Sequence, residues 1–346
     1  MSARSVVFAN LGLAFDGRSA EEQPMGGVES SLIALAEALA ARGHRVRVYN
    51  RCAEPVTHRG VEWIPIGQGL PWRADLYVAN RDHALLLGVP LARRRALWLH
   101  NPGWKAASWP FRAKLAALPA DIVVLGEYHR ATCPDWMQRR IVTIPLGLAE
   151  RFRHQPPRPE PPPPRAVFTS NPARDLDWLL RVWCERIRPH VPAAELLLFS
   201  GPQVYQMRPG SGLDLMNSVL AKAASLGAHG VRPQRPLTRQ ALARQVAQAR
   251  AMLYRGHEEE TFCLALAEAQ ALGVPCVVQA IGSTPERVRD GLTGHLARDE
   301  AGFAEHAIRL LTDDAAWAAM HRNALRLQAG RSWDDAARDF EGLMGA

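Results

Sequence analysis

Two acidic residues, Glu260 and Glu268, are separated by seven apolar or neutral residues. The surrounding sequence predicts a helix over 262–272, so Glu260 would precede this helix and Glu268 would lie inside it, near its positive end. Unpaired N–H groups at a helix start favour an anion such as a diphosphate, and we expect these groups at Thr261, Phe262, Cys263 and Leu264. One carboxylate could then accept hydrogen bonds from a sugar, and the other from the two hydroxyls of a ribose. Taken alone, the pair favours the simpler interpretation of two surface acids on an alanine-rich helix.

Five further features accompany the glutamate pair along the chain. They are a Gly-Gly loop at 26–27, His100 after an apolar strand, Ile-Pro-Leu-Gly at 144–147, Pro-Glu-Arg-Val-Arg-Asp-Gly at 285–291, and Trp333 in the last helix. Together with the pair they resemble the retaining, nucleotide-sugar-dependent glycosyltransferases of family 4, over nearly the whole chain. The resemblance implies an α/β fold of the GT-B architecture. That architecture has two Rossmann-like domains facing each other across a cleft, with a C-terminal helix that crosses back to the first domain.

The resemblance also implies that the residues around the glutamate pair bind the donor. Glu268 would hold the ribose hydroxyls, and Glu260 would contact the donor sugar and could stabilise positive charge at its anomeric carbon. Arg174 would neutralise the leaving diphosphate, although Thr-Ser (169–170) stands where the family usually has Gly-Arg. Arg255 is a candidate for a second cation. A surface arginine at a helix start explains Arg174 nearly as well.

Two glycine-containing loops are expected to meet the donor. Gly26 and Gly27 would let the backbone of the first domain approach the diphosphate, because glycine tolerates positive φ and close contacts. Gly282 and Ser283 stand where the resembled family often has Gly-Gly, and they would line the donor pocket. An ordinary turn between a strand and a helix is the alternative for Gly26 and Gly27.

Two residues in the first half are expected near the transferred sugar or the acceptor. His100 ends the run Ala-Leu-Trp-Leu-His and would contact the donor sugar or the acceptor, as the resemblance implies. Glu29, in the first turn of an expected helix, would touch the acceptor. For an isolated histidine, a structural position at a strand end would be the simpler interpretation, and the order of motifs favours the functional one.

The pattern Asp175-Leu176-Asp177 has the D-x-D spacing of a metal site, but it falls at an expected helix start, where aspartate is a favoured cap. We therefore expect no metal and no cofactor. The resemblance implies a metal-independent, retaining enzyme of the hexosyltransferase type. It would move a sugar from a nucleotide diphosphate sugar to a hydroxyl of a glycan, lipid-linked or small-molecule acceptor. The alternatives on this fold are a sugar-nucleotide epimerase and a non-catalytic binder of sugar nucleotides or glycans.

The composition of the chain excludes several other classes of protein. With 346 residues, 47% apolar and 22% charged, the chain is long enough for two ordinary globular domains. No apolar run reaches the roughly 20 residues of a membrane span, and the N-terminal strand is too short for a signal peptide. Five scattered cysteines without a metal or disulfide pattern fit the cytoplasm. The net charge of +8 is dispersed, so nucleic acid is not an expected partner. The aromatic and basic residues of 104–115 leave open a peripheral contact with the inner face of the membrane.

Alternation of strands and helices predicts two parallel-sheet halves. Strands are expected at 5–10, 45–50, 61–66, 75–80, 95–100, 121–125 and 140–144, and then at 166–170, 195–199, 228–232, 250–254 and 274–279. Helices are expected at 28–42, 105–118, 175–188, 213–226, 238–248, 262–272, 300–312, 314–328 and 333–344. Seven prolines in 155–164 predict a stiff linker. The expected divisions are an acceptor-side domain at 1–154, the linker at 155–164, a donor domain at 165–328 and the final helix at 329–346.

Overall fold

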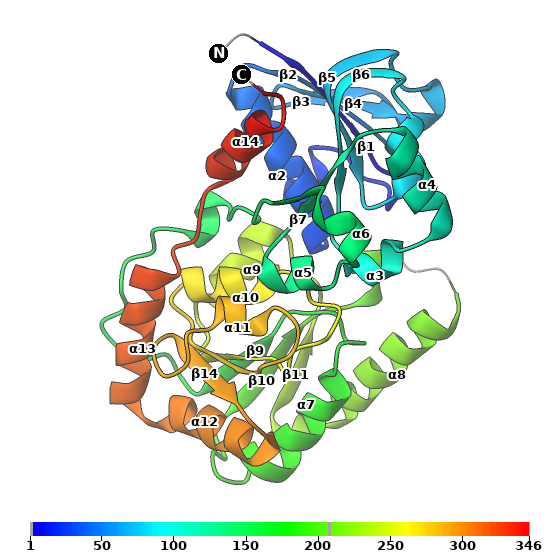
Figure 1. Cartoon of the computed structure of the whole chain (residues 1–346). Helices are drawn as coiled ribbons and strands as arrows, with labels where there is room; N and C mark the ends of the chain where they lie inside the picture. The colour runs from blue at the N-terminus through cyan, green and yellow to red at the C-terminus, as the bar shows by residue number, and fades with distance from the viewer. Residues whose placement is uncertain (1–2, 207–208, 346) are drawn as a thin grey trace. The chain divides into compact units, whose positions relative to one another are not determined.

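The computed structural model describes residues 3–206 and 209–345, and the chain divides into two units (Figure 1). The first unit comprises Met1–Glu22, Gly27–Gly147 and Arg331–Ala346, and the second comprises Gln23–Gly26 and Leu148–Gly330. The proline-rich segment 155–164 therefore lies inside the second unit. The chain passes from the first unit to the second at Gly147, before these prolines.

Eight strands of the described first unit form one sheet in the order β3-β4-β2-β1-β5-β6-β7-β8, and all neighbours are parallel except β3 and β4. The strands are β1 (Ser5–Ala9), β2 (Arg45–Asn50), β3 (Val56–His58), β4 (Val61–Pro65), β5 (Arg73–Asn80), β6 (Leu91–Trp98), β7 (Asp121–Val124) and β8 (Ile141–Thr143). The seven expected strands are present. The sequence did not predict β3, because this three-residue edge strand carries little apolar pattern.

Helices cover this sheet, and the longest, α2, buries Leu32, Leu35, Ala36 and Leu39 as the helical spacing predicts. The helical segments are α1 (Ser19–Glu22), α2 (Gly27–Ala41), η1 (Ile66–Gln68), η2 (His83–Leu87), α3 (Gly103–Ala106), α4 (Trp109–Ala117), α5 (Glu127–Ala131), α6 (Asp135–Gln138) and α14 (Trp333–Gly342). The continuous helix expected at 105–118 was wrong. The Ser108 hydroxyl accepts a hydrogen bond from the Phe111 N–H and begins a separate helix, α4.

The second unit has an all-parallel sheet of six strands within the described residues, in the order β11-β10-β9-β12-β13-β14. The strands are β9 (Arg165–Phe168), β10 (Glu195–Phe199), β11 (Val231–Gln234), β12 (Ala251–Leu253), β13 (Cys276–Gln279) and β14 (Gly294–Ala297). This is the strand order of a Rossmann fold, in which the direction of winding reverses between β9 and β12. The sequence did not predict β14. It also placed β11 three residues early, where the 3-10 turn η6 (Gly227–His229) lies.

The helical segments of the second unit follow the expected alternation. They are η3 (Glu150–Phe152), α7 (Leu176–Val182), the π-helical turn η4 (Trp183–Ile187), η5 (Pro202–Tyr205), α8 (Ser211–Ser225), α9 (Arg239–Val246), α10 (Leu264–Ala271), α11 (Thr284–Arg287), α12 (Glu300–Thr312) and α13 (Asp314–Leu327). Figure 1 shows helices on both faces of this sheet. Within the described residues, no helix combines the length and the apolar character needed to cross a bilayer.

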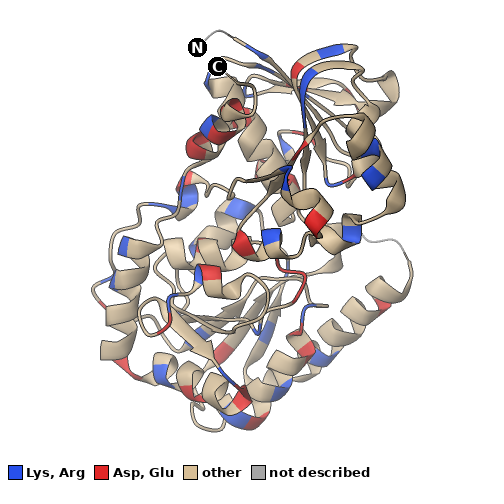
Figure 2. Ribbon diagram, viewed as in Figure 1, with Lys and Arg blue, Asp and Glu red and all other residues tan. Residues whose placement is uncertain are grey.

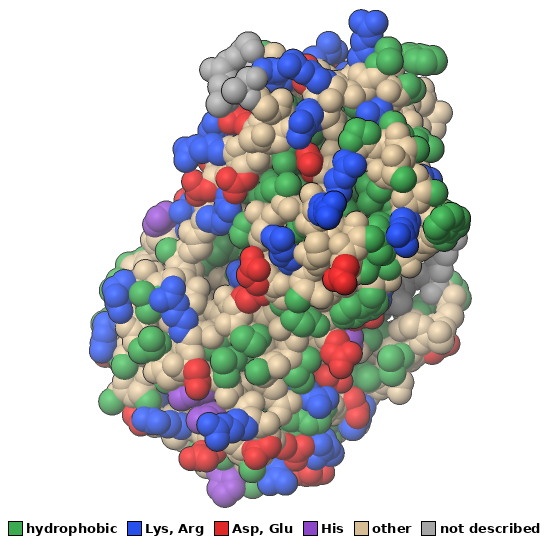
Figure 3. Space-filling model, in the orientation of Figure 1, with side chains coloured by type: hydrophobic (Ala, Val, Ile, Leu, Met, Phe, Trp, Pro, Cys, Tyr) green, Lys and Arg blue, Asp and Glu red, His purple; other side chains and the backbone are tan. Residues whose placement is uncertain are grey.

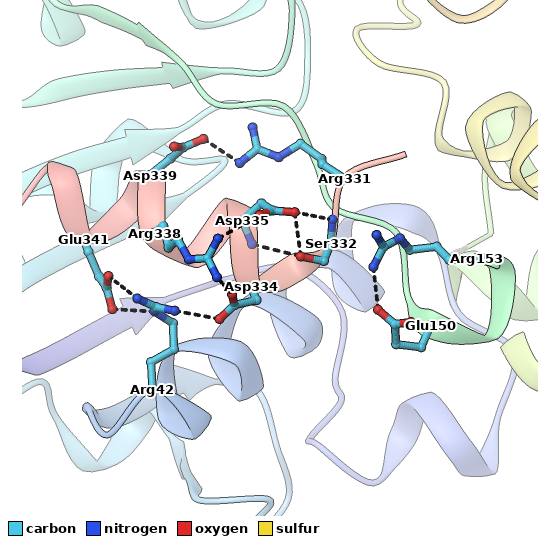
Figure 4. Close-up of polar contacts among 10 residues, drawn as sticks. All are labelled: Arg42, Glu150, Arg153, Arg331, Ser332, Asp334, Asp335, Arg338, Asp339 and Glu341. Carbon is cyan, nitrogen blue, oxygen red and sulfur yellow. Dashed lines mark hydrogen bonds and ion pairs between the residues drawn. The ribbon is translucent and has the colours of Figure 1, made fainter. Parts of the chain in front are cut away.

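The final helix, α14, belongs to the first unit and lies beside α2 (Figures 1 and 4). It begins with a capping box in which Ser332 and Asp335 exchange hydrogen bonds. The buried carboxylate of Glu341 accepts hydrogen bonds from Arg42 Nε at 2.6 Å and from His44 Nε2 at 2.8 Å. The Phe340 ring meets Trp98 edge-on, with 5.3 Å between centroids. The C-terminal helix is thus part of the first unit's core, as expected.

We predict that Glu341→Ala lowers the free energy of unfolding by roughly 2–4 kcal/mol, because it leaves the buried His44 N–H and the Arg42 guanidinium without their acceptor. Urea unfolding monitored by circular dichroism measures the change. The control is Glu62→Ala, whose partner Arg45 is 67% exposed and whose loss should cost less than about 1 kcal/mol. Equal losses in the two variants would contradict the role assigned to Glu341.

His321 holds the proline-rich segment to α13. Its Nε2 accepts the Arg158 N–H at 2.8 Å, and its Nδ1–H donates to the Gly273 carbonyl at 2.6 Å. The ring stacks on Trp317, with 4.6 Å between centroids. Burial lowers the pKa of His321 below its ordinary value, because the charged form of the ring is poorly solvated there.

This pKa shift predicts a pH-dependent stability. The unfolded chain takes up a proton on His321 as the pH falls below about 6.5, whereas the folded chain resists it, so the stabilisation is present above that pH and is lost below it. The difference in unfolding free energy between the wild type and His321→Gln should therefore shrink from about pH 7.5 to about pH 5.5. Urea titrations at both pH values measure it. A difference that does not change with pH would refute the assignment.

Candidate active site

The residues expected to bind ligands fall into one group in each unit, and both groups lie at the carboxyl ends of parallel strands. In an open α/β sheet, the ligand crevice lies at these ends, where the strand order reverses direction. In the second unit the reversal falls between β9 and β12, and in the first unit between β1 and β5. Arg174 follows β9 and Glu260 follows β12, so the donor-site candidates flank the strand reversal of the second unit.

Helix α10 begins two residues later than the sequence predicts, directly after Cys263. Cys263 is the N-cap residue and adopts a left-handed backbone conformation with φ of 57°. Ala267 donates its N–H to the Cys263 carbonyl at 3.2 Å, so Leu264 and Ala265 belong to the first turn, whose N–H groups have no acceptor within the helix. The positive end of α10 therefore lies among the predicted residues 261–264 and favours an anion.

The two carboxylates beside this helix start are not the solvated acids of the simpler interpretation. Glu260 and Glu268 are each 6% exposed. Glu260 forms an ion pair with Arg174, from the loop after β9, and Glu268 forms one with Arg239, the first residue of α9. Burial of a carboxylate is costly without such a partner, so these two pairs fix the loop and α9 against α10.

Arg239 was not predicted from the sequence, because it lies far from Glu268 along the chain in an otherwise ordinary amphipathic helix. Its guanidinium lies 5.3 Å from the centroid of the Phe152 ring. Burial, with a smaller contribution from Arg151, lowers the pKa of Arg239 to about 10. Arg239 therefore stays protonated at neutral pH and carries a buried positive charge next to Glu268.

The loop at Gly282 and Ser283 packs against the loop that carries Glu260. The Ser283 N–H donates to the Glu260 carbonyl at 2.9 Å. Gly282 has φ of 65°, and a Cβ there would collide with the His257 carbonyl and lie 3.0 Å from that of Glu260. Ser283 is fully buried, and its hydroxyl has no hydrogen-bond partner among the described residues. Gly282 thus allows the close approach that holds Glu260 at the helix start.

The expected capping role of Asp175 was wrong. Asp175 has φ of 57° and makes no capping hydrogen bond, and its carboxylate accepts instead from Arg255 Nη1 at 3.2 Å. Arg255 also donates to Gln279 Oε1 at 2.9 Å and lies 5.2 Å from the centroid of the Trp178 ring. Asp177 pairs with Lys222. The described residues contain no group of three or more His, Cys, Asp or Glu side chains arranged to hold a metal ion.

Three predicted residues, Thr261, Phe262 and Cys263, directly precede α10. The ring of Phe262 lies 4.2 Å from the Arg287 guanidinium, which places a second cation near this turn. Burial raises the pKa of the Cys263 thiol to about 12, so it stays protonated and is a poor nucleophile. Thr261 and Phe262 are both buried, so this turn presents its backbone rather than large exposed side chains.

In the first unit, a chain of side-chain amides leads from His100 to the strand reversal. His100 Nε2 lies 3.0 Å from Asn80 Oδ1, and Asn80 Nδ2 donates to Asn10 Oδ1 at 3.1 Å. Asn10 directly follows β1, and Asn80 ends β5. Burial holds the pKa of His100 well below its ordinary value, helped by the nearby Arg81. His100 is therefore neutral near pH 7. It can form hydrogen bonds, but it is not protonated and so is not available as a general acid.

Glu29 lies in the first turn of α2 and is also buried, 3.9 Å from Arg81 Nη1. Burial raises the pKa of Glu29, so its carboxyl holds a proton more readily than an exposed glutamate does. Gly27 is the first residue of α2 in the first unit, whereas Gly26, directly before it, belongs to the second unit. Asn10, Asn80 and Arg81 were not predicted from the sequence. A signal was present, because three apolar strands end in asparagine at positions 10, 50 and 80.

Comparison with known proteins defines the class of this fold. Residues 163–313 match the model of a family described as glycosyl transferases group 1. Over its length the chain is similar to sucrose-phosphate synthase from Thermosynechococcus elongatus, with 18% identity, a TM-score of 0.71, and coverage of 98% of this chain and 97% of that one. It is also similar to Anabaena HepE in complex with UDP and glucose, with 14% identity, a TM-score of 0.71, and coverage of 99% and 100%. The expected fold class, GT-B, is confirmed.

Among curated proteins, a D-inositol 3-phosphate glycosyltransferase of Frankia alni is 33% identical over 183 residues, which are 48% of this chain and 44% of the relative. The chain spans half or less of the length of the curated relatives that match it first. These findings show the GT-B fold and a similarity to glycosyltransferases. Membership of the retaining family 4 stays a prediction, as do the roles of the individual residues.

The contact between Gly282 and the Glu260 loop generates a prediction. Gly282→Ala should lower stability by roughly 2–4 kcal/mol, because the added Cβ is both strained at positive φ and in collision with the His257 carbonyl. The control is Gly291→Ala, where φ is 70° but nothing lies within 4 Å of the added Cβ. That control should lose only the strain, about 1 kcal/mol. Denaturant unfolding compares the two, and an equal effect would show that the contact is unimportant.

Proposed function

We propose that this chain is a retaining glycosyltransferase of the hexosyltransferase type that uses a nucleotide diphosphate sugar and needs no metal ion. The observation that carries the proposal is the pairing of buried Glu260 with Arg174 across the β9–β12 reversal, directly before the start of α10. A diphosphate needs cations and N–H donors, and a sugar needs carboxylate acceptors, and these groups occur together here. The match of 163–313 to glycosyl transferases group 1 supports the same class.

Each group has a defined task in this proposal. The first-turn N–H groups of α10 and the Arg174 guanidinium bind the diphosphate and stabilise the negative charge that grows on it as the glycosidic bond breaks. Glu260 accepts hydrogen bonds from the donor sugar, and its charge favours the positive anomeric carbon. Glu268 accepts hydrogen bonds from the ribose hydroxyls, with Arg239 fixing the carboxylate. The departing phosphate oxygen receives the proton of the acceptor hydroxyl, so no protein base is required.

In the first unit, His100 is assigned to binding rather than to proton transfer. Its hydrogen bond to Asn80 orients the ring, and burial keeps it neutral, so it can bind a sugar hydroxyl without changing charge between pH 6 and 8. Glu29 is assigned to the acceptor. We assign the acceptor to the class of glycans, lipid-linked sugars or small polyols. The curated relative from Frankia alni is named for an inositol phosphate.

A thermal-shift panel of UDP-, GDP-, ADP- and dTDP-sugars tests the donor site. One nucleotide class should raise the melting temperature, and UDP is the first candidate because the structure similar to this chain holds UDP. Glu268→Gln should weaken the binding of that donor about 10- to 100-fold, since it replaces a charged acceptor. Glu305→Gln, an exposed acid on α12, is the matched control and should bind like the wild type. No shift with any nucleotide sugar would contradict the proposal.

Turnover separates a transferase from a binder. With the stabilising donor and a mixture of polyol and glycan acceptors, release of the nucleoside diphosphate should be detectable, should continue in EDTA, and should fall at least about 100-fold in Arg174→Ala. Nuclear magnetic resonance of the product should show the donor's anomeric configuration. Binding without turnover under all conditions would instead indicate a non-catalytic sugar-nucleotide binder, and inhibition by EDTA would refute metal independence.

A further inference from the structure

The exposed apolar side chains of this protein are concentrated in one part of the first unit. Among the described residues, five of the eight exposed large hydrophobic side chains lie between positions 72 and 109. Trp109 is 76% exposed and Trp72 is 74% exposed, which is unusual for side chains of this size. We call this set the aromatic face, and its members are Trp72, Leu87, Leu91, Trp104 and Trp109.

The members of the aromatic face lie on adjoining elements. The Leu91 N–H donates to the Trp72 carbonyl at 3.0 Å, so these two residues are neighbours at the beginning of β5 and β6. Leu87 ends η2, four residues before Leu91. At the other end of η2, the His83 ring stacks on Phe111 of α4, with 4.9 Å between centroids.

Helix α4 and η2 also share a polar contact. The Ser108 hydroxyl lies 3.3 Å from His83 Nε2, and Trp109 is the next residue. Side chains of η2 and α4 are buried together in one hydrophobic cluster that includes Leu86 and Phe111. The two elements therefore cover the same part of the sheet and carry their exposed residues on one side of it.

The charge of this region has a single sign. Residues 83–120 contain six Lys or Arg and no Asp or Glu, and two of the three lysines of the whole chain are among them. The basic residues are Arg93, Arg94, Arg95, Lys105, Arg112 and Lys114. Figure 2 shows basic and no acidic residues on α3 and α4, and Figure 3 shows basic and hydrophobic side chains interspersed on this side of the first unit.

The cations of this region differ in their surroundings. Arg95 is buried and donates to the carbonyls of Val89 and Pro90, and Arg94 pairs with Asp121. By contrast, Arg93 and Arg112 are exposed. The aromatic face is therefore bordered by the exposed cations Arg93 and Arg112.

We propose that the aromatic face docks on the surface of an anionic lipid bilayer. Tryptophan prefers the boundary between headgroups and acyl chains, leucine gains by entering the acyl region, and arginine and lysine are attracted to anionic headgroups. The aliphatic pair Leu87 and Leu91 distinguishes this partner from a nucleic acid, which stacks on aromatic rings but gains nothing from exposed leucines. A second copy in a two-fold dimer would bring like charges together. This inference stands independently of the proposed transferase activity.

Vesicle sedimentation tests the docking surface. The full chain should bind vesicles of equal parts phosphatidylcholine and phosphatidylglycerol, and should bind vesicles of phosphatidylcholine alone at least about tenfold more weakly. High salt should reduce the binding, because exposed charges are screened. The double variant Trp72→Ser/Trp109→Ser and the charge variant Arg93→Glu/Arg112→Glu should each bind anionic vesicles at least about tenfold more weakly than the wild type.

The matched control removes two exposed leucines from the second unit, in Leu215→Ser/Leu292→Ser, and should bind vesicles like the wild type. Circular dichroism and thermal melting of each variant show whether it is folded. Since the substituted side chains are exposed, we expect melting temperatures close to that of the wild type. Equal vesicle binding by the aromatic variant and the control would overturn the proposal. Binding of a labelled single-stranded RNA in place of anionic vesicles would overturn it as well.

Discussion

The donor-site candidates of this protein depend on one constraint, which is that two buried carboxylates must each be compensated by an arginine. Glu260 and Glu268 lie on either side of the start of α10 and are almost fully buried. An uncompensated carboxylate there would be protonated or would disrupt the fold, so Arg174 and Arg239 must come to it from the β9 loop and from α9. The ion pairs therefore bring three separate segments to the point where the sheet order reverses.

Compensation of a buried carboxylate by an arginine also occurs at Glu341 in the first unit, where it holds two helices together. That carboxylate has two partners, Arg42 and His44, and Arg42 Nη1 also reaches Asp334 (Figure 4). Arg42 keeps the pKa of Glu341 below its ordinary value, with a smaller contribution from His44. The network ties α14 to α2 and leaves the Glu341 carboxylate enclosed. At Glu268 the partner is Arg239, whose guanidinium is itself buried, and burial lowers its pKa.

Patterns that depend on neighbours in the sequence were predictable, and those that depend on tertiary partners were not. Helical and strand periodicity located every expected strand to within a few residues, because burial of one face leaves a local signature. Gly147 is an example of a residue explained by a tertiary neighbour. A Cβ at this position would lie 2.6 Å from the Trp333 nitrogen, so the close passage of the backbone that enters α14 requires glycine here. The sequence contains the glycine but does not indicate that the backbone entering α14 passes beside it. Asp175 failed as a predicted cap for the same reason, because its partner Arg255 lies in a distant loop.

Each unit also has a distinct chemical character at its strand ends. In the second unit the side chains near the reversal are charged, with arginines and glutamates in pairs. In the first unit, His100, Asn80 and Asn10 form a chain of groups that are neutral near pH 7, beside the ion pair of Arg81 with Glu29. Charged groups suit a diphosphate, whose binding is electrostatic, whereas neutral amides and imidazole suit hydroxyls, which they can bind without the cost of burying another charge. This division agrees with the proposed donor side in the second unit and a sugar or polyol in the first, and it explains why sequence motifs identify the donor side better. Charged residues at a helix start form recognisable patterns, while an asparagine at a strand end is common in proteins of every function.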